Sequence, residues 1–142
     1  MPRFFTSYST AFAAAATIVA TAAFAETTTI KINLSGKAQV PPNDSKAAGT
    51  ADVTSDTNSK KLGWRINYSG LTGPATMAHF HGPAEAGKNA PVVIPITPAS
   101  SPSEGSVTLT DTQAADLMAG KMYINVHTDA HKGGEIRGQV TK

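Results

Sequence analysis

The chain of 142 residues contains no cysteine, which excludes disulfide bonds, thiolate metal sites and cysteine nucleophiles. Aromatic residues are also scarce, because beyond residue 25 only Trp64, Tyr68, Phe80 and Tyr123 occur. A hydrophobic core must therefore be built mainly from Ile, Val, Leu and Ala. Packing of these side chains, with the help of any bound ion, has to supply the stability.

Charge of one sign is not in excess either. The 12 Lys and Arg residues nearly balance the 10 Asp and Glu residues, and no basic cluster is present. Nucleic acid is not an expected partner, because a protein that binds it presents a basic face to the phosphates. The sequence also lacks a P-loop, a Rossmann fingerprint and a G-x-S-x-G motif, which removes several common enzyme classes.

Long apolar runs are absent except at the N-terminus. Arg3 precedes an uncharged stretch over residues 11–24, and Ala23-Phe24-Ala25 forms an A-x-A cleavage signal before Glu26. This pattern is typical of a secretory signal peptide over residues 1–25. We expect a periplasmic or secreted protein whose residues 26–142 form one domain without a membrane span.

What is present beyond residue 26 is a hydrophobic period of two, which indicates half-buried β-strands. The clearest strands are predicted at residues 30–34, 62–68 and 122–126, with weaker ones at 49–53, 77–81, 92–94, 106–110 and 134–140. Thr110 and Gln113 have capping-box spacing, which predicts one short helix near residues 111–119. We therefore predict an all-β fold, an antiparallel Greek-key-like β-sandwich or barrel of about eight strands with one short helix.

The four histidines lie in two short clusters, His79 with His81 and His127 with His131. Residues two apart in a strand face the same side, so His79 and His81 present their imidazoles together. The phase of strand 122–126 turns His127 away from the core, and we expect it to be accessible. If the two strands are neighbours, His79, His81 and His127 reach one ion, and His131 is a candidate fourth ligand only.

Imidazole ligands suit copper, zinc and nickel, whereas the lack of thiolates and of clustered carboxylates disfavours iron–sulfur centres and calcium. Copper is the expected metal because it stands highest in the affinity series, and zinc is possible. Met77 can add a soft ligand for Cu(I), although packing is its simpler role. Asp129, Glu135 or a backbone carbonyl can orient an imidazole.

Two motifs resemble the signatures of the CHRD domain, the module named after chordin. The first is AHFHGPA at residues 78–84 with PVV at 91–93, and the second is YINVHT at 123–128 with GGEIRGQ at 133–139. The resemblance extends over about residues 30–140 and implies a β-sandwich or barrel. It carries over His79, His81, His127, Glu135 and Arg137 as signature positions, but not His131.

The order of His79, His81, His127 and Arg137 is also similar to that in copper-zinc superoxide dismutases, in which an arginine guides the anion to copper. The chain has no His-rich zinc loop and no cysteine, so this resemblance implies at most a copper-only site. Arg137 would then have the anion-guiding role. Glu135 and Arg137 are equally compatible with a structural ion pair.

Three functions follow from these patterns. An exported protein that binds or buffers copper needs only the three histidines. A copper-only superoxide dismutase-like enzyme also needs an open coordination position and Arg137. A non-catalytic extracytoplasmic interaction module would use sheet edges or loops. The histidine pattern favours copper binding.

Overall fold

A computed structural model describes Met1 and residues 26–142 of the chain. The predicted signal peptide over residues 1–25 lies outside the described residues, apart from Met1. Within the described part, no helix has the length and apolar character needed to cross a bilayer.

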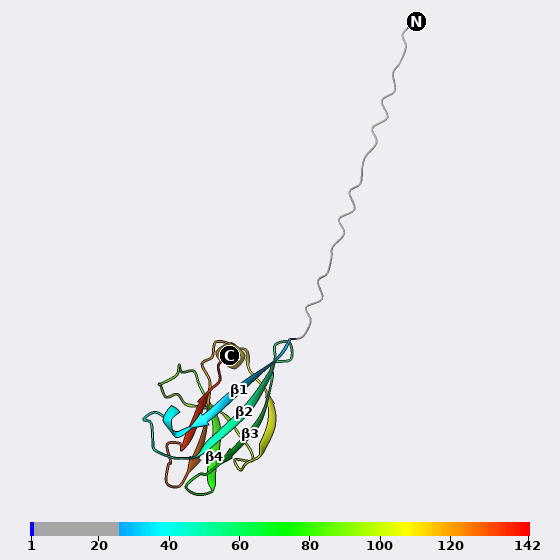
Figure 1. The fold of residues 1–142 in the computed structure, drawn as a ribbon. Helices are drawn as coiled ribbons and strands as arrows, with labels where there is room; N and C mark the ends of the chain where they lie inside the picture. Colours follow the sequence, from blue (N-terminus) through cyan, green and yellow to red (C-terminus); the bar gives the residue numbers. More distant parts are fainter. Residues whose placement is uncertain (2–25) are drawn as a thin grey trace.

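The described residues form one antiparallel sheet of eight strands in the order β5-β4-β7-β8-β1-β2-β3-β6 (Figure 1). This confirms the all-β prediction. The strands and helices are β1 (Thr27–Ser35), the 3-10 helix η1 (Gly36–Ala38), β2 (Ala48–Asp56), β3 (Lys61–Ser69), β4 (Ala75–His81), β5 (Val92–Pro95), β6 (Ser103–Thr108), α1 (Asp111–Met118), β7 (Tyr123–Thr128) and β8 (Ile136–Gln139).

The short helix α1 begins where its capping box predicts. The Thr110 hydroxyl accepts a hydrogen bond from the Gln113 backbone N–H at 3.2 Å, and the Gln113 side chain accepts one from the Thr110 N–H at 3.0 Å. Thr110 is the N-cap of α1 and does not extend the strand, so β6 ends at Thr108, two residues before its predicted end.

The sheet curls so that its two halves pack on one core. Trp64 of β3 and Phe80 of β4 belong to strands far apart in the sheet order, yet their rings meet edge to face with centroids 5.6 Å apart. Alternate residues of β1, Ile30, Ile32 and Leu34, are buried in the same cluster. The core therefore consists mainly of aliphatic side chains around this one aromatic contact.

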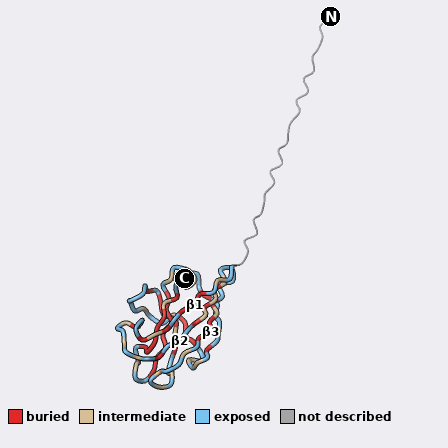
Figure 2. The backbone as a smooth tube through the Cα atoms, in the orientation of Figure 1, coloured by how far each residue is buried: buried red, intermediate tan, exposed pale blue. Residues whose placement is uncertain are grey.

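Strand β7 is buried on both faces along its whole length, and Figure 2 shows buried chain running through the middle of the domain. Ile124 and Val126 face the core as predicted. His127, on the opposite face, is only 6% exposed, so its predicted accessibility is wrong. Loops cover this face: Gln39 bonds to Asn125, and the turn after β7 covers His127.

Candidate metal centre

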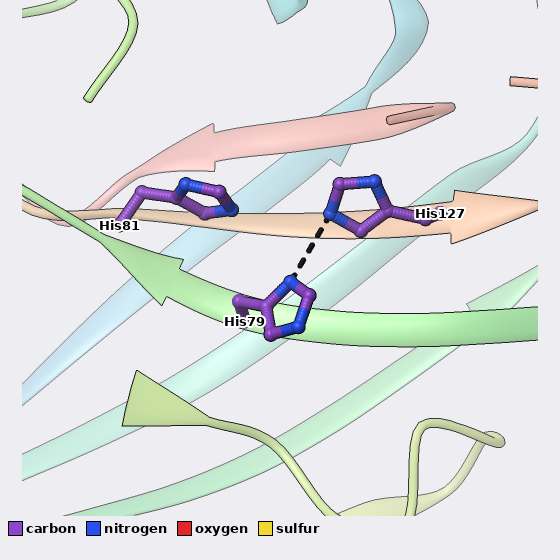
Figure 3. A group of neighbouring side chains, drawn as sticks. All are labelled: His79, His81 and His127. Atoms are coloured by element: carbon purple, nitrogen blue, oxygen red, sulfur yellow. Dashed lines mark hydrogen bonds between the residues drawn. The ribbon is translucent and has the colours of Figure 1, made fainter. Parts of the chain in front are cut away.

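The antiparallel pairing of β4 with β7 brings three of the four histidines together. In this register His79 lies opposite Asn125 and Met77 lies opposite His127, which places His127 diagonally across from His79. Each of the rings of His79, His81 and His127 offers one nitrogen, and these atoms all lie within 4.8 Å of one another (Figure 3). The strand adjacency that the three-histidine site required is therefore present.

The spacing of these nitrogens suits one bound ion. Two imidazole nitrogens at about 2 Å from a tetrahedral ion lie about 3.3 Å apart. His79 Nδ1 and His127 Nε2 are already 3.2 Å apart. The nitrogen that His81 offers lies within 4.8 Å of the other two, and the centroid of its ring is 5.5 Å from that of His79 and 6.0 Å from that of His127.

Backbone carbonyls fix the orientation of two of the rings. His81 Nδ1 is 2.9 Å from the Ala90 carbonyl oxygen, and His127 Nδ1 is 2.9 Å from that of Lys132. Since a carbonyl only accepts, the network assigns the proton to Nδ1 in both rings. The Nε2 of His127 then accepts a hydrogen bond from His79 Nδ1, and the Nε2 of His81 keeps its lone pair free. Of the three orienting groups considered from the sequence, the carbonyl is the one these contacts provide.

The Nε2 atom of His81 is buried and has no hydrogen-bond partner among the described residues. A buried polar atom without a partner is rare and destabilising. Here the atom belongs to a cluster of three imidazole nitrogens with no thiolate or carboxylate. A metal ion that accepts imidazole donors fits this arrangement and would satisfy the atom.

The surroundings of His79 and His81 favour the neutral forms of these two imidazoles. Burial lowers the pKa of His79 below its ordinary value, and the charges of His127 and His81 lower it further. Burial also lowers the pKa of His81; the hydrogen bond to Ala90 raises it, while the charges of His127 and Arg137 lower it. Neutral imidazole is the form that binds a metal, so the lowered pKa values of His79 and His81 favour metal binding by these two rings.

Tyr123 supports the site, although sequence reasoning did not include it. Its ring is parallel to that of His81, and its hydroxyl bonds to both the N–H and the carbonyl of Ala90, at 3.0 and 3.2 Å. The guanidinium of Arg137 lies 3.5 Å from the centroid of the Tyr123 ring. The sequence signal that could have identified Tyr123 is its phase, since it shares a strand face with His127.

Arg137 is only 1% exposed and donates to the Asn89 side chain at 3.1 Å and to the Lys88 carbonyl at 2.7 Å. Because β7 lies between β4 and β8, Tyr123 separates Arg137 from His81. Among the described residues Arg137 forms no ion pair with Glu135. The structural ion pair considered for these two residues from the sequence is therefore wrong.

Glu135 instead connects two loops to the end of β7. Its buried carboxylate accepts hydrogen bonds from the Ser45 hydroxyl, the Thr72 hydroxyl and backbone N–H, and the Thr128 hydroxyl, at 2.6–2.9 Å. Burial raises the pKa of Glu135, but hydrogen bonds from Ser45, Thr128 and Thr72 outweigh this and lower it to about 2. Since Thr128 directly follows His127, this network fixes the end of the strand that carries a candidate ligand.

The remaining sequence candidates lie outside the group of three nitrogens. His131 lies in the turn after β7, where its backbone N–H donates to the Thr128 carbonyl at 3.1 Å, and it does not belong to the cluster. Met77 lies on β4 opposite His127 and is 50% exposed, so it is not packed in the core.

Comparison with known proteins identifies one family. Residues 30–140 match the family model of the CHRD domain. No curated protein and no solved structure matches the chain. The matched range includes all of the residues that form the candidate metal centre.

Proposed function

The chain belongs to the CHRD domain family, and on that premise we propose that it is an exported protein that binds or buffers copper through His79, His81 and His127. The unpartnered Nε2 of buried His81 is the observation that carries this proposal. It lies in a cluster whose geometry, protonation and neighbours all favour metal binding.

Copper is favoured over other metals by the donor set. Three neutral imidazoles without a thiolate or carboxylate suit copper and zinc, and copper has the higher affinity for such ligands. Met77 lies on the same strand face as His79 and His81, opposite His127. Its thioether is a soft donor that favours Cu(I), which gives copper a further advantage over zinc.

The position of Arg137 supports binding rather than turnover. A residue that guides an anion to a metal has to present its charge on the approach to that metal. The Tyr123 ring separates Arg137 from His81, and Arg137 lines a cavity that none of the clustered histidines lines. A copper-only superoxide dismutase-like enzyme, the second candidate from the sequence, gains no support from this arrangement.

The test is a metal titration of residues 26–142 with Cu(II), with Cu(I) under reducing conditions, and with Zn(II). We expect one ion per chain and a loss of copper affinity of at least 100-fold in His81→Ala. The matched control is His131→Ala, which removes a histidine outside the cluster and should bind copper as the wild type does.

An equal loss of copper affinity in His81→Ala and His131→Ala would contradict the assignment of the site. If the wild type binds no metal more tightly than the His79→Ala/His81→Ala/His127→Ala variant, the interaction-module hypothesis takes its place. Superoxide removal by the copper-loaded wild type, absent from Arg137→Gln, would instead favour the enzyme.

A further inference from the structure

A cavity of about 360 Å³ opens beside β8. One wall is formed by η1 and the segment that follows it, and the opposite wall by the loop that follows β4. Its polar lining comes from Lys37, Gln39, Arg137 and Gln139. None of the three clustered histidines lines it. The cavity is therefore separate from the candidate metal centre, and its volume falls in the range of small-molecule sites.

The cavity is lined by positive charge, and no carboxylate in its wall pairs with that charge. Arg137 and Lys37 both line it, and no Asp or Glu does. The hydrogen bonds of Arg137 go to neutral acceptors, namely the Asn89 and Gln139 side chains and the Lys88 carbonyl. A buried guanidinium is ordinarily paired with an anion, because desolvating an isolated cation is costly. An anion in the cavity would supply that partner.

The other walls of the cavity are apolar. Val40 and Pro42 contribute from the segment after η1, and Ala86 contributes from the loop after β4. Inorganic anions such as sulfate gain nothing from such walls, whereas a short hydrocarbon chain is stabilised by burial there. The lining thus combines a cationic end with a small apolar compartment.

We propose that this cavity binds a small organic carboxylate, with its carboxylate directed at Arg137 and Lys37 and its hydrocarbon part against Val40, Pro42 and Ala86. A planar guanidinium matches a carboxylate through paired N–H···O hydrogen bonds. Binding in this site needs no metal.

The experiment is a calorimetric and NMR titration of metal-free protein, kept in chelator, with butyrate and hexanoate. We expect saturable binding with a dissociation constant below about 1 mM, and at least tenfold weaker binding of the uncharged butyramide. Sulfate should bind more weakly than hexanoate. Amide resonances of Ala38 and Gly87, which line the cavity, should shift on addition of the carboxylate.

Variants separate the site from general electrostatic attraction. Lys37→Gln removes a cavity charge at an exposed position and should weaken hexanoate binding about threefold, and Ala86→Leu should weaken it further by filling the apolar compartment. Lys61→Gln, which removes an exposed lysine of β3 that does not line the cavity, is the matched control and should have no effect. Arg137→Gln should abolish binding, with its fold checked by circular dichroism.

Equal binding of butyramide and butyrate, or equal effects of Lys37→Gln and Lys61→Gln, would overturn the proposal. So would the absence of saturable binding by the wild type at 10-fold the expected dissociation constant. The readout does not depend on copper, because His81→Ala should bind hexanoate normally even though it loses metal affinity.

Discussion

The rings of His81 and Tyr123 are stacked in parallel, with planes 5° apart and centroids 4.9 Å apart. The two residues are cross-strand partners in β4 and β7. The same tyrosine hydroxyl bonds to Ala90, whose carbonyl accepts from His81 Nδ1. Tyr123 therefore holds His81 both through its ring face and through the backbone that fixes the tautomer.

Tyr123→Phe keeps the stack and removes only the hydrogen bonds to Ala90. We expect a loss of about 1–2 kcal/mol in the free energy of unfolding of the metal-free protein and a several-fold loss of copper affinity. Urea unfolding and metal titration measure the two effects. Tyr68→Phe is the matched control, since it removes a hydrogen bond from a tyrosine hydroxyl to the Ala99 carbonyl away from the site. It should lower stability without changing copper affinity.

Glu135→Gln keeps the shape of the side chain but removes its charge. The folded pKa of Glu135 is about 2, against 4.5 as the ordinary value. Its contribution to folding stability, on the order of 3 kcal/mol, is complete above pH 4.5 and is lost as the pH falls toward 2. The stability difference between wild type and variant, measured by urea unfolding, should therefore narrow over that window.

The control for this pH dependence is Glu104→Gln. Glu104 forms an ion pair with Arg65 at 2.9 Å in which both side chains are well exposed. Its removal should change stability by less than about 1 kcal/mol at any pH. A difference in the free energy of unfolding between Glu135→Gln and wild type that stays constant from pH 7 to pH 2 would contradict the role assigned to the carboxylate.

Gly134→Ala should be strongly destabilising. Gly134 has a φ of 117°, and an added Cβ would come within 2.0 Å of the Asn125 side-chain oxygen. Strain and collision together should cost more than about 2 kcal/mol, seen as a lower midpoint of thermal unfolding. Gly133→Ala, where a Cβ meets nothing within 4 Å, is the neighbouring control and should unfold near the wild-type temperature.

Met77→Leu tests whether the thioether selects the metal. Leucine conserves most of the volume at this half-exposed position but cannot donate to an ion. We expect Cu(I) affinity to fall about tenfold while Zn(II) affinity is unchanged. Met118→Leu changes an equally exposed methionine on α1 and should alter neither affinity. An equal loss for both metals in Met77→Leu would show that the residue acts through packing.

Export is tested by the N-terminus of the protein recovered from cells. If residues 1–25 are a signal peptide, the protein isolated outside the cytoplasm should begin at Glu26. Edman degradation or intact-mass measurement determines the first residue. Replacing Ala23 and Ala25 by larger residues should leave the precursor uncleaved, and recovery of an intact N-terminus from wild-type cells would contradict the prediction.

Local patterns predicted the strands, the cap of α1 and the pair His79/His81, because each depends on residues close together in the chain. The approach of β4 to β7 could not be derived that way, since it depends on pairing across 48 residues between His79 and His127. The predicted exposure of His127 failed for a related reason. Strand phase tells which face a residue occupies, but not whether loops from elsewhere cover that face.

The hydrogen-bond acceptors that orient His81 and His127 are main-chain atoms of Ala90 and Lys132. Every residue type carries such a carbonyl, so the side chains at these two positions are free to vary without loss of the acceptor. Adding or removing a residue in either loop would displace the carbonyl itself. The site is consequently tolerant of changes in loop composition and intolerant of changes in loop length, and insertion scanning would reveal its limits more clearly than alanine scanning.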